Sequence, residues 1–165
     1  MPKKHLNKDK KKRAVKRQGC CGLFACLYAL GIKVKTAEDI EKYRRMCLEK
    51  GLVPCPHGKR WLGGTTRWDR TRILNHFGAK VESVPFRGKT LERVLKDKSI
   101  YQTKGDYLVT VTKHVLFLRT NMRKTKLFLV DQRGVRMYLG SDALKRNCGQ
   151  RVRDIVRVSV PVEAL

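Results

Sequence analysis

The stretch Gln18-Gly-Cys-Cys-Gly-Leu-Phe-Ala-Cys-Leu-Tyr-Ala-Leu-Gly31 decides how this chain is interpreted. From Gly22 to Leu30 its residues are small or apolar almost without interruption, which predicts a helix buried on all sides rather than an amphipathic surface helix. Gly31 supplies a C-terminal stop. Cys21 would lie in the first turn, beside unpaired backbone N–H groups and the positive end of the helix dipole, and both favour thiolate over thiol. This placement is typical of a nucleophilic cysteine.

Length and composition predict one folded domain without a membrane span. The 165 residues are enough for a single core. Hydrophobic residues make up 41% of the chain, and no apolar run approaches the roughly 20 residues needed to cross a bilayer. The Lys-rich start lacks the apolar segment of a signal peptide, so we expect reduced cysteines and an intracellular or virion location, not secretion. We expect no membrane partner and no cofactor.

The charge of the chain predicts a polyanionic partner. Lys and Arg number 39 against 14 Asp and Glu, which gives a formal net charge of +25. We expect DNA or RNA, bound through its phosphates without sequence preference. Residues 1–17 have almost nothing to bury, so they predict a flexible basic arm ahead of a domain at 18–165. The candidate phosphate-binding residues of the arm are Lys10, Lys11, Lys12, Arg13, Lys16 and Arg17.

Beyond Gly31 the pattern predicts helices first and a sheet last. Thr36-Ala-Glu-Asp39 resembles a capping box, and the helix that follows it ends at Gly51. Thr65-Thr66 begins another helix, with Trp68, Ile73, Leu74 and Phe77 on its apolar face. Shorter helices are expected at 90–97 and 141–146. Strands are expected at 79–86, 107–112, 114–120, 126–131, 135–139 and 154–160. This order predicts an α+β fold whose helices pack on an antiparallel sheet.

Three polar residues stand out against this pattern. Cys21 lies at the helix mouth, His114 within a strand-forming run, and Asp131 at the end of the next strand. Each alone has an ordinary explanation in core packing, in a satisfied strand histidine or in a turn. If the two strands form a hairpin, His114 and Asp131 come near opposite positions. The acid could then orient the imidazole while its other nitrogen faces the thiol, which is the arrangement of a catalytic triad.

This order of residues resembles the papain-like cysteine peptidases, and among them the compact double-glycine bacteriocin-processing peptidases of bacterial exporters. The shared motifs are a Cys-Gly pair that opens the central helix, a His followed by aliphatic residues, and an aliphatic strand that ends in Asp. Here they are Cys21-Gly22, His114-Val-Leu-Phe-Leu118 and Leu127-Phe-Leu-Val-Asp131. The resemblance covers most of 18–160. It implies a papain-like fold and cleavage of peptide bonds after small residues, through a thioester.

The order and spacing of the site residues qualify this resemblance. Adenovirus-type and SUMO-protease-type enzymes have a similar helix, but they place His and the acid before the Cys, and no suitable His precedes Cys21 here. Exporter peptidases carry an oxyanion-hole Gln about six residues before the nucleophile, where this chain has Val15. Gln18 either reaches the site on a shortened loop, or the hole uses the Cys21 N–H and another donor. Cys20 is a second possible nucleophile, although Gly22 favours Cys21.

Two other groups of residues leave alternatives open. A metal site is weak by spacing compared with zinc ribbons, and none is predicted; its ligands would be Cys47, Cys55 and His57 with His76 or Cys148. An aromatic and basic segment could stack on nucleic acid and neutralise it. It contains Trp61, Trp68, Arg60, Arg67, Arg70 and Arg72. We expect Trp68 in the core and these arginines on a solvated face.

The sequence therefore predicts a papain-like thiol peptidase that works beside nucleic acid, for example in a virus or phage particle or a ribonucleoprotein. Cys21 would be the nucleophile, His114 the general base and then acid, and Asp131 the orienting residue. A second hypothesis is a papain-like scaffold that has lost catalysis and serves as a basic structural or cargo protein. A third is a nucleic-acid-binding α+β module with incidental cysteines. Reactivity of Cys21 distinguishes them, since all three predict salt-dependent binding to DNA or RNA.

Overall fold

The computed structural model of this chain describes residues 21–54, 65–87, 90–96, 105–112, 114–121, 124–130, 136–137 and 148–161. The helices in these ranges are α2 (Cys21–Ala29), α3 (Ala37–Glu49), α4 (Arg67–His76) and α5 (Leu91–Lys96). The strands are β1 (Lys80–Ser83), β2 (Gly105–Val111), β3 (His114–Asn121), β4 (Lys124–Val130), β5 (Arg136–Met137) and β6 (Val152–Ser159). The predicted α+β class is confirmed, and the papain-like assignment stays a prediction.

Helix α2 is buried as its apolar sequence predicts. Leu23, Cys26 and Leu27 are completely buried, while Tyr28 is half-buried. The helix ends at a glycine because the chain there needs a left-handed backbone: Gly31 has φ +75°. The N–H of Gly31 donates to the carbonyl of Tyr28 at 3.0 Å, and the N–H of Ile32 donates to that of Leu27 at 2.9 Å. This geometry satisfies carbonyls that the helix end would otherwise leave unpaired.

Helices α3 and α4 both begin with a capping box. In α3 the Thr36 hydroxyl accepts from the Asp39 N–H, and the Asp39 carboxylate accepts from the Thr36 N–H, each at 3.2 Å. In α4 Thr66 and Asp69 make the same pair of hydrogen bonds, at 3.2 and 2.9 Å. The two boxes confirm both predicted helix starts, with Asp in the place usually taken by Glu or Gln.

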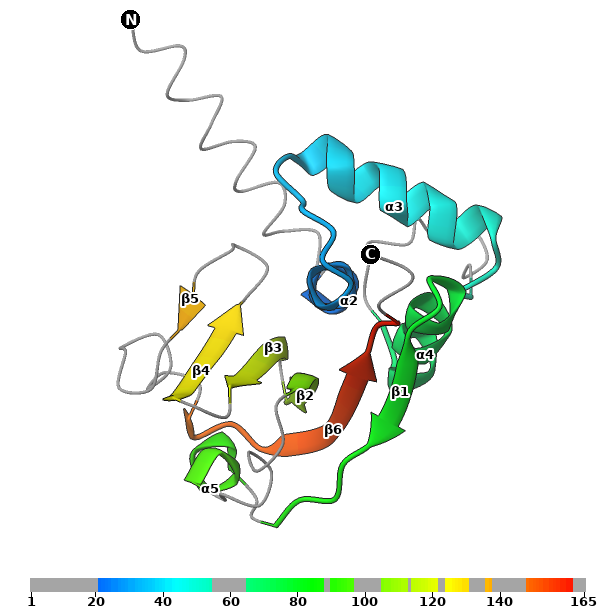
Figure 1. Cartoon of the computed structure of the whole chain (residues 1–165). Coiled ribbons are helices and arrows are strands. Elements are labelled where there is room, and N and C mark those ends of the chain that lie inside the picture. The colour runs from blue at the N-terminus through cyan, green and yellow to red at the C-terminus, as the bar shows by residue number, and fades with distance from the viewer. Residues whose placement is uncertain are drawn as a thin grey trace, which may run out of the picture.

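The sheet is antiparallel throughout the described strands, in the order β1-β6-β2-β3-β4-β5. Among the described strands, β6 comes last in sequence, yet it lies between β1 and β2 (Figure 1). Strands β2 and β3 form a hairpin in which Val111 pairs with His114. Strands β3 and β4 pair with Phe117 opposite Val130, so the predicted hairpin between the strands of His114 and Asp131 is confirmed.

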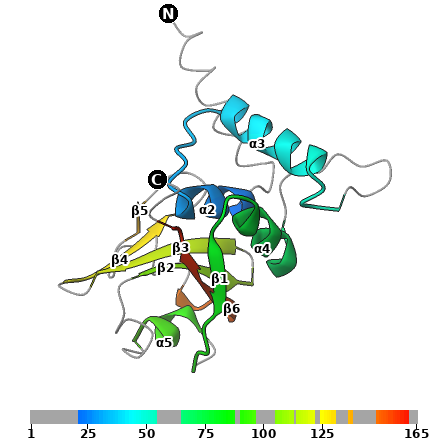
Figure 2. The same ribbon diagram turned by 45° about the vertical axis from the view of Figure 1, so that its right-hand side comes forward.

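Each face of the sheet carries its own apolar layer. Leu108, Val115 and Phe117 belong to the cluster that contains α2. Val109 and Leu116, which alternate with them, belong to the cluster that contains α5. Figure 2 shows α2, α3 and α4 on one side of the sheet and α5 on the other. The central strands are therefore apolar on both faces because helices cover both of them.

The expectation that Trp68 is a core residue is wrong, because 66% of its surface is exposed. Arg70, which was expected on a solvated face, is only 4% exposed. The physical reason is the helical period: Arg70, Ile73 and Leu74 follow the i, i+3, i+4 spacing and form the inward stripe of α4. Trp68 lies outside that stripe, so the core of this part of the fold includes an arginine instead of a tryptophan.

Several predictions fall on residues outside the described ranges. They concern the basic arm at 1–17, Gln18, the helix at 141–146 and Asp131. The described strands β1 and β5 are shorter than the expected 79–86 and 135–139. In the part of the chain that the structure describes, no helix has both the length and the apolar character needed to cross a membrane.

Candidate functional site

Cys21 is the first residue of α2, as predicted, and the position of its sulfur lies outside what the structure describes. The next residue, Gly22, lies directly against Thr65, the second residue before α4. A Cβ added at Gly22 would collide with the hydroxyl of Thr65, so only glycine fits there without a shift. The N-terminal end of α2 is therefore fixed against the beginning of α4.

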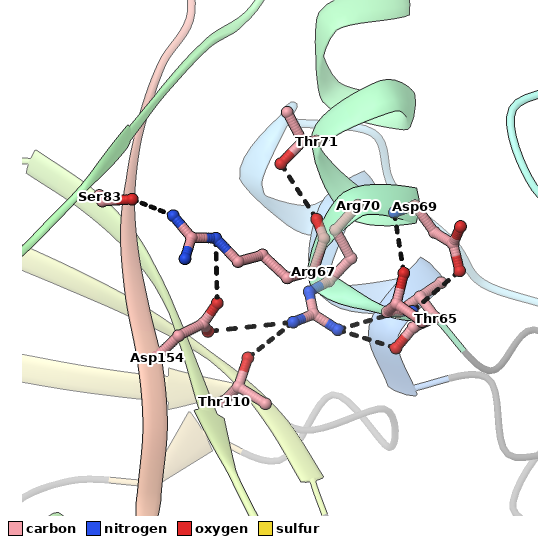
Figure 3. A network of polar contacts seen from close by, with 9 residues as sticks. Thr65, Arg67, Asp69, Arg70, Thr71, Ser83, Thr110 and Asp154 are labelled. Atoms are coloured by element: carbon pink, nitrogen blue, oxygen red, sulfur yellow. Dashed lines mark hydrogen bonds and ion pairs between the residues drawn. The ribbon is translucent and has the colours of Figure 1, made fainter.

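A buried arginine continues this contact into the sheet (Figure 3). Arg70 donates through Nη1 to the Thr65 carbonyl at 3.0 Å and to the Thr65 hydroxyl at 3.2 Å. Its Nη2 donates to the Thr110 hydroxyl on β2 at 2.8 Å and lies 3.9 Å from the Asp154 carboxylate on β6. A charge this deeply buried needs such partners, because its desolvation would otherwise be costly.

Arg67 adds a second link between α4 and the sheet. Its Nε lies 3.6 Å from Asp154, and its Nη2 donates to the hydroxyl of Ser83 at the end of β1 (Figure 3). Asp154 thus faces two guanidinium groups from one helix. This network was not predicted from the sequence. The spacing of Arg70 from Ile73 and Leu74 was the available signal for an inward arginine, whereas its partner Asp154 is remote in sequence.

His114 is the first residue of β3 and is half-buried. It pairs with Val111, which follows Thr110, the β2 residue bound by Arg70. Through Thr65, Arg70 and Thr110, the N-terminal end of α2 and the start of β3 therefore lie at the same end of the molecule. This brings the backbone of Cys21 and the strand of His114 into one region of the fold.

The strand alternation, however, assigns His114 to the other face of the sheet. Side chains alternate along a strand, so His114 belongs with Leu116, which packs on the α5 side. Val115 and Phe117 belong to the α2 side. The described residues thus bring Cys21 and His114 to one end of the sheet but not to one face. Asp131, which follows the last residue of β4, and Gln18 lie outside the described ranges.

Two other thiols of this region are unsuited to nucleophilic chemistry. Burial raises the pKa of Cys26 to about 12, although the nearby Arg70 charge opposes the shift. Burial likewise raises the pKa of Cys47 to about 11. Both thiols therefore stay protonated at neutral pH, and a thiol in that state is a poor nucleophile.

Two of the possible metal ligands, Cys47 and Cys148, lie on opposite sides of the sheet. Cys47 is buried in the cluster on the α2 side, whereas Cys148 packs against the cluster on the α5 side. The sheet separates them, so they cannot bind the same ion. In the part of the chain that is described, no group of three His, Cys, Asp or Glu side chains is arranged to hold a metal ion. Cys55 and His57 lie outside it.

The surface carries far more exposed basic than acidic side chains. Among the described residues the exposed Lys and Arg are Lys33, Lys35, Lys42, Arg45, Lys50, Arg67, Arg72, Lys80, Arg87, Arg93, Lys96, Arg119, Arg151 and Arg153. The exposed acids are Glu38, Glu49, Glu82 and Glu92. The remaining described carboxylates serve caps or ion pairs, as Asp106 does with Arg119 at 2.8 Å. The excess positive charge therefore faces solvent.

Comparisons with known proteins return no match of any kind: neither a family model, nor a curated protein, nor a solved structure is similar to this chain.

Proposed function

We propose that the chain is a thiol peptidase of the papain-like type, with Cys21 as nucleophile, His114 as general base and acid, and Asp131 as the residue that orients the imidazole. One observation carries the proposal: the N-terminal end of α2 and the start of β3 meet at one end of the fold, connected through Thr65, Arg70 and Thr110. Nucleophile and base of such an enzyme must come from elements that converge in this way.

The reaction would follow the usual course of acyl transfer to a thiol. The Cys21 thiolate attacks the peptide carbonyl carbon, and the developing oxyanion accepts hydrogen bonds from the Cys21 N–H and from Gln18. As the C–N bond breaks, the His114 imidazolium gives its proton to the departing amine, and a thioester remains. Water then attacks the thioester while His114 takes a proton, which releases the carboxylic acid and regenerates the thiolate–imidazolium pair. We propose small residues on the acyl side of the cleaved bond.

The position of His114 sets the condition that this proposal must meet. Because strand alternation assigns its side chain to the α5 side, the backbone at the start of β3 must change its orientation before the imidazole can reach Cys21. A direct measurement of pairing between the two residues therefore decides the proposal.

The test is the pH dependence of alkylation at Cys21 by iodoacetamide, measured by peptide mass spectrometry in the wild type, His114→Ala and Asp131→Asn. We expect rapid labelling well below pH 8 in the wild type and slower labelling in both variants, because a paired imidazolium stabilises the thiolate. Cys26 and Cys47 serve as internal controls that stay unlabelled in the native protein. Labelling that follows an ordinary thiol pKa near 8.5 and ignores His114 would contradict the proposal.

The second candidate function is that of a basic structural or cargo protein bound to nucleic acid in a virion or ribonucleoprotein. The specific observation in its favour is the surface described above, where most carboxylates are used internally while lysines and arginines face solvent. This candidate predicts that Cys21→Ser leaves nucleic-acid binding unchanged and that no peptide is cleaved. The alkylation experiment separates the two candidates.

A further inference from the structure

The indole of Trp68 is 66% exposed and lies outside both apolar clusters of the fold. It is the one large hydrophobic side chain that is exposed among the described residues. Trp68 lies in the first turn of α4, and the end of this helix is held in place by the capping box of Thr66 and Asp69 and by the contacts of the buried Arg70. The backbone that carries this exposed indole is therefore fixed, and tryptophan is a residue type enriched at recognition surfaces.

The surroundings of the ring are basic and held in place. The Arg67 guanidinium lies 5.5 Å from the centre of the indole ring. Arg72, one turn further along α4, is half exposed and is held by Asp69 at 2.5 Å and by the Leu52 carbonyl at 2.9 Å. A guanidinium has five N–H donors, so both arginines retain donors for an external anion. Together with Arg70 they outnumber the two acids, Asp69 and Asp154, that pair with them.

We propose that Trp68 is a stacking platform for an unpaired base of single-stranded nucleic acid, with Arg67 and Arg72 contacting the phosphates on either side. An indole can stack on any base, and arginines beside it can neutralise the backbone, so the surface needs no sequence preference. A base inside a duplex is already stacked and does not offer its face. The proposal goes beyond peptide cleavage and does not depend on it.

The test uses the full chain carrying Trp61→Phe, in which Trp68 is the only tryptophan. Its fluorescence is titrated with an oligothymidylate of about 12 nucleotides and with an abasic oligomer of equal phosphate number. We expect strong quenching by the first and little by the second. The affinities of the Trp68 variants are measured by the anisotropy of dye-labelled oligomers, because a variant without Trp68 has no tryptophan signal. Trp68→Ala should weaken binding of the oligothymidylate by roughly fivefold to a hundredfold and leave binding of the abasic oligomer unchanged, because only the bases stack. Trp68→Phe should keep most of the affinity.

The arginines are tested by a matched pair of charge variants. Arg67→Gln removes one charge beside the ring, and Arg93→Gln removes one from α5 on the opposite side of the sheet. We expect Arg67→Gln to weaken oligothymidylate binding more and to reduce the slope of log affinity against log salt by about one. Alkylation of Cys21 should be the same in the Trp68 variants and in Arg93→Gln, so failure here is distinguishable from failure of the peptidase proposal.

Three results would overturn the proposal. The first is equal loss of affinity for the thymidylate and abasic oligomers in Trp68→Ala, which would mean that the ring does not stack on bases. The second is tighter binding of a duplex than of the single strand. The third is a blue shift of Trp68 emission with vesicles of anionic phospholipid and none with the oligomer, which would assign the surface to a membrane.

Discussion

At the scale of single residues, Gly22 has no room for a side chain, because Thr65 lies against it. An alanine in a helix normally stabilises it by roughly 0.5–1 kcal/mol relative to glycine. Here we expect the opposite sign: Gly22→Ala should destabilise the protein by about 1–3 kcal/mol, because the added Cβ collides with Thr65. The free energy of unfolding in urea measures this effect.

A control variant at another glycine and a double variant with Thr65 test whether the collision is the cause. Gly149 has open space around its Cα, so Gly149→Ala should change stability by far less. Thr65→Ala removes the colliding group, so the double variant with Gly22→Ala should lose less stability than the sum of the two single changes. Strict additivity of the two would show that Gly22 and Thr65 do not touch.

At the scale of elements, the start of α3 couples stability to pH. Backbone N–H groups of Lys35 and Thr36 hold the pKa of Asp39 below its usual value. A carboxyl whose pKa is lower in the folded state stabilises the fold above its unfolded pKa of about 3.9, and this contribution disappears as pH falls through the folded value. We therefore expect Asp39→Asn to reduce stability at pH 7 and to have a much smaller effect near pH 3.

A change at Thr36, whose hydroxyl caps the same helix, provides the comparison with Asp39→Asn. Thr36→Ala should cost about 1 kcal/mol at pH 7, and only part of this loss should depend on pH, because the hydroxyl caps the Asp39 N–H and also helps to lower the pKa of the Asp39 carboxyl. Urea unfolding at both pH values measures each variant. If the two variants had the same pH dependence, the capping box would not be the source of the effect.

The helices were predictable from the sequence because residues close to each helix end determine where the helix begins and stops. Thr36, Thr66, Gly31, Gly51 and Gly78 act through their own backbone neighbourhood, and the three glycines do adopt positive φ. The orientation of α4 was not predicted. The hydrophobicity of Trp68 suggested that it faces the core, whereas the residues that do so follow the helical spacing from Arg70. What allows an arginine there is a partner on β6, which no local pattern indicates.

The candidate site was predictable in order but not in geometry. The sequence indicated that Cys21 opens a helix and His114 a strand, and both are so placed. It did not indicate the face of β3 on which His114 lies. A strand with polar and apolar residues in alternation reveals its faces, but His114-Val-Leu-Phe-Leu118 is apolar on both, because helices cover both sides of the sheet.

At the scale of the whole molecule, the surface charge opposes compactness. With a net charge of +25, the exposed lysines and arginines repel one another in the folded state. Raising the salt concentration from about 0.01 to about 0.15 M shortens the screening length from about 30 Å to about 8 Å. We expect the melting temperature to rise over this range, as measured by circular dichroism. The rise should be smaller when Lys33 and Lys80, both exposed, are changed to Gln; a falling melting temperature would contradict this account.

The position of β6 between β1 and β2 has a consequence for folding during translation. Among the described strands, β1 has no neighbour other than β6, and one edge of β2 stays open until β6 arrives. The layer around α2 also includes Val156 and Val158 of that strand. Until β6 has been made, β1 and one edge of β2 therefore lack their strand partner, and the apolar layer around α2 is only partly covered. The described sheet is complete only after residues 152–159 have been made, so a chain that stalls before β6 exposes the surfaces that drive aggregation.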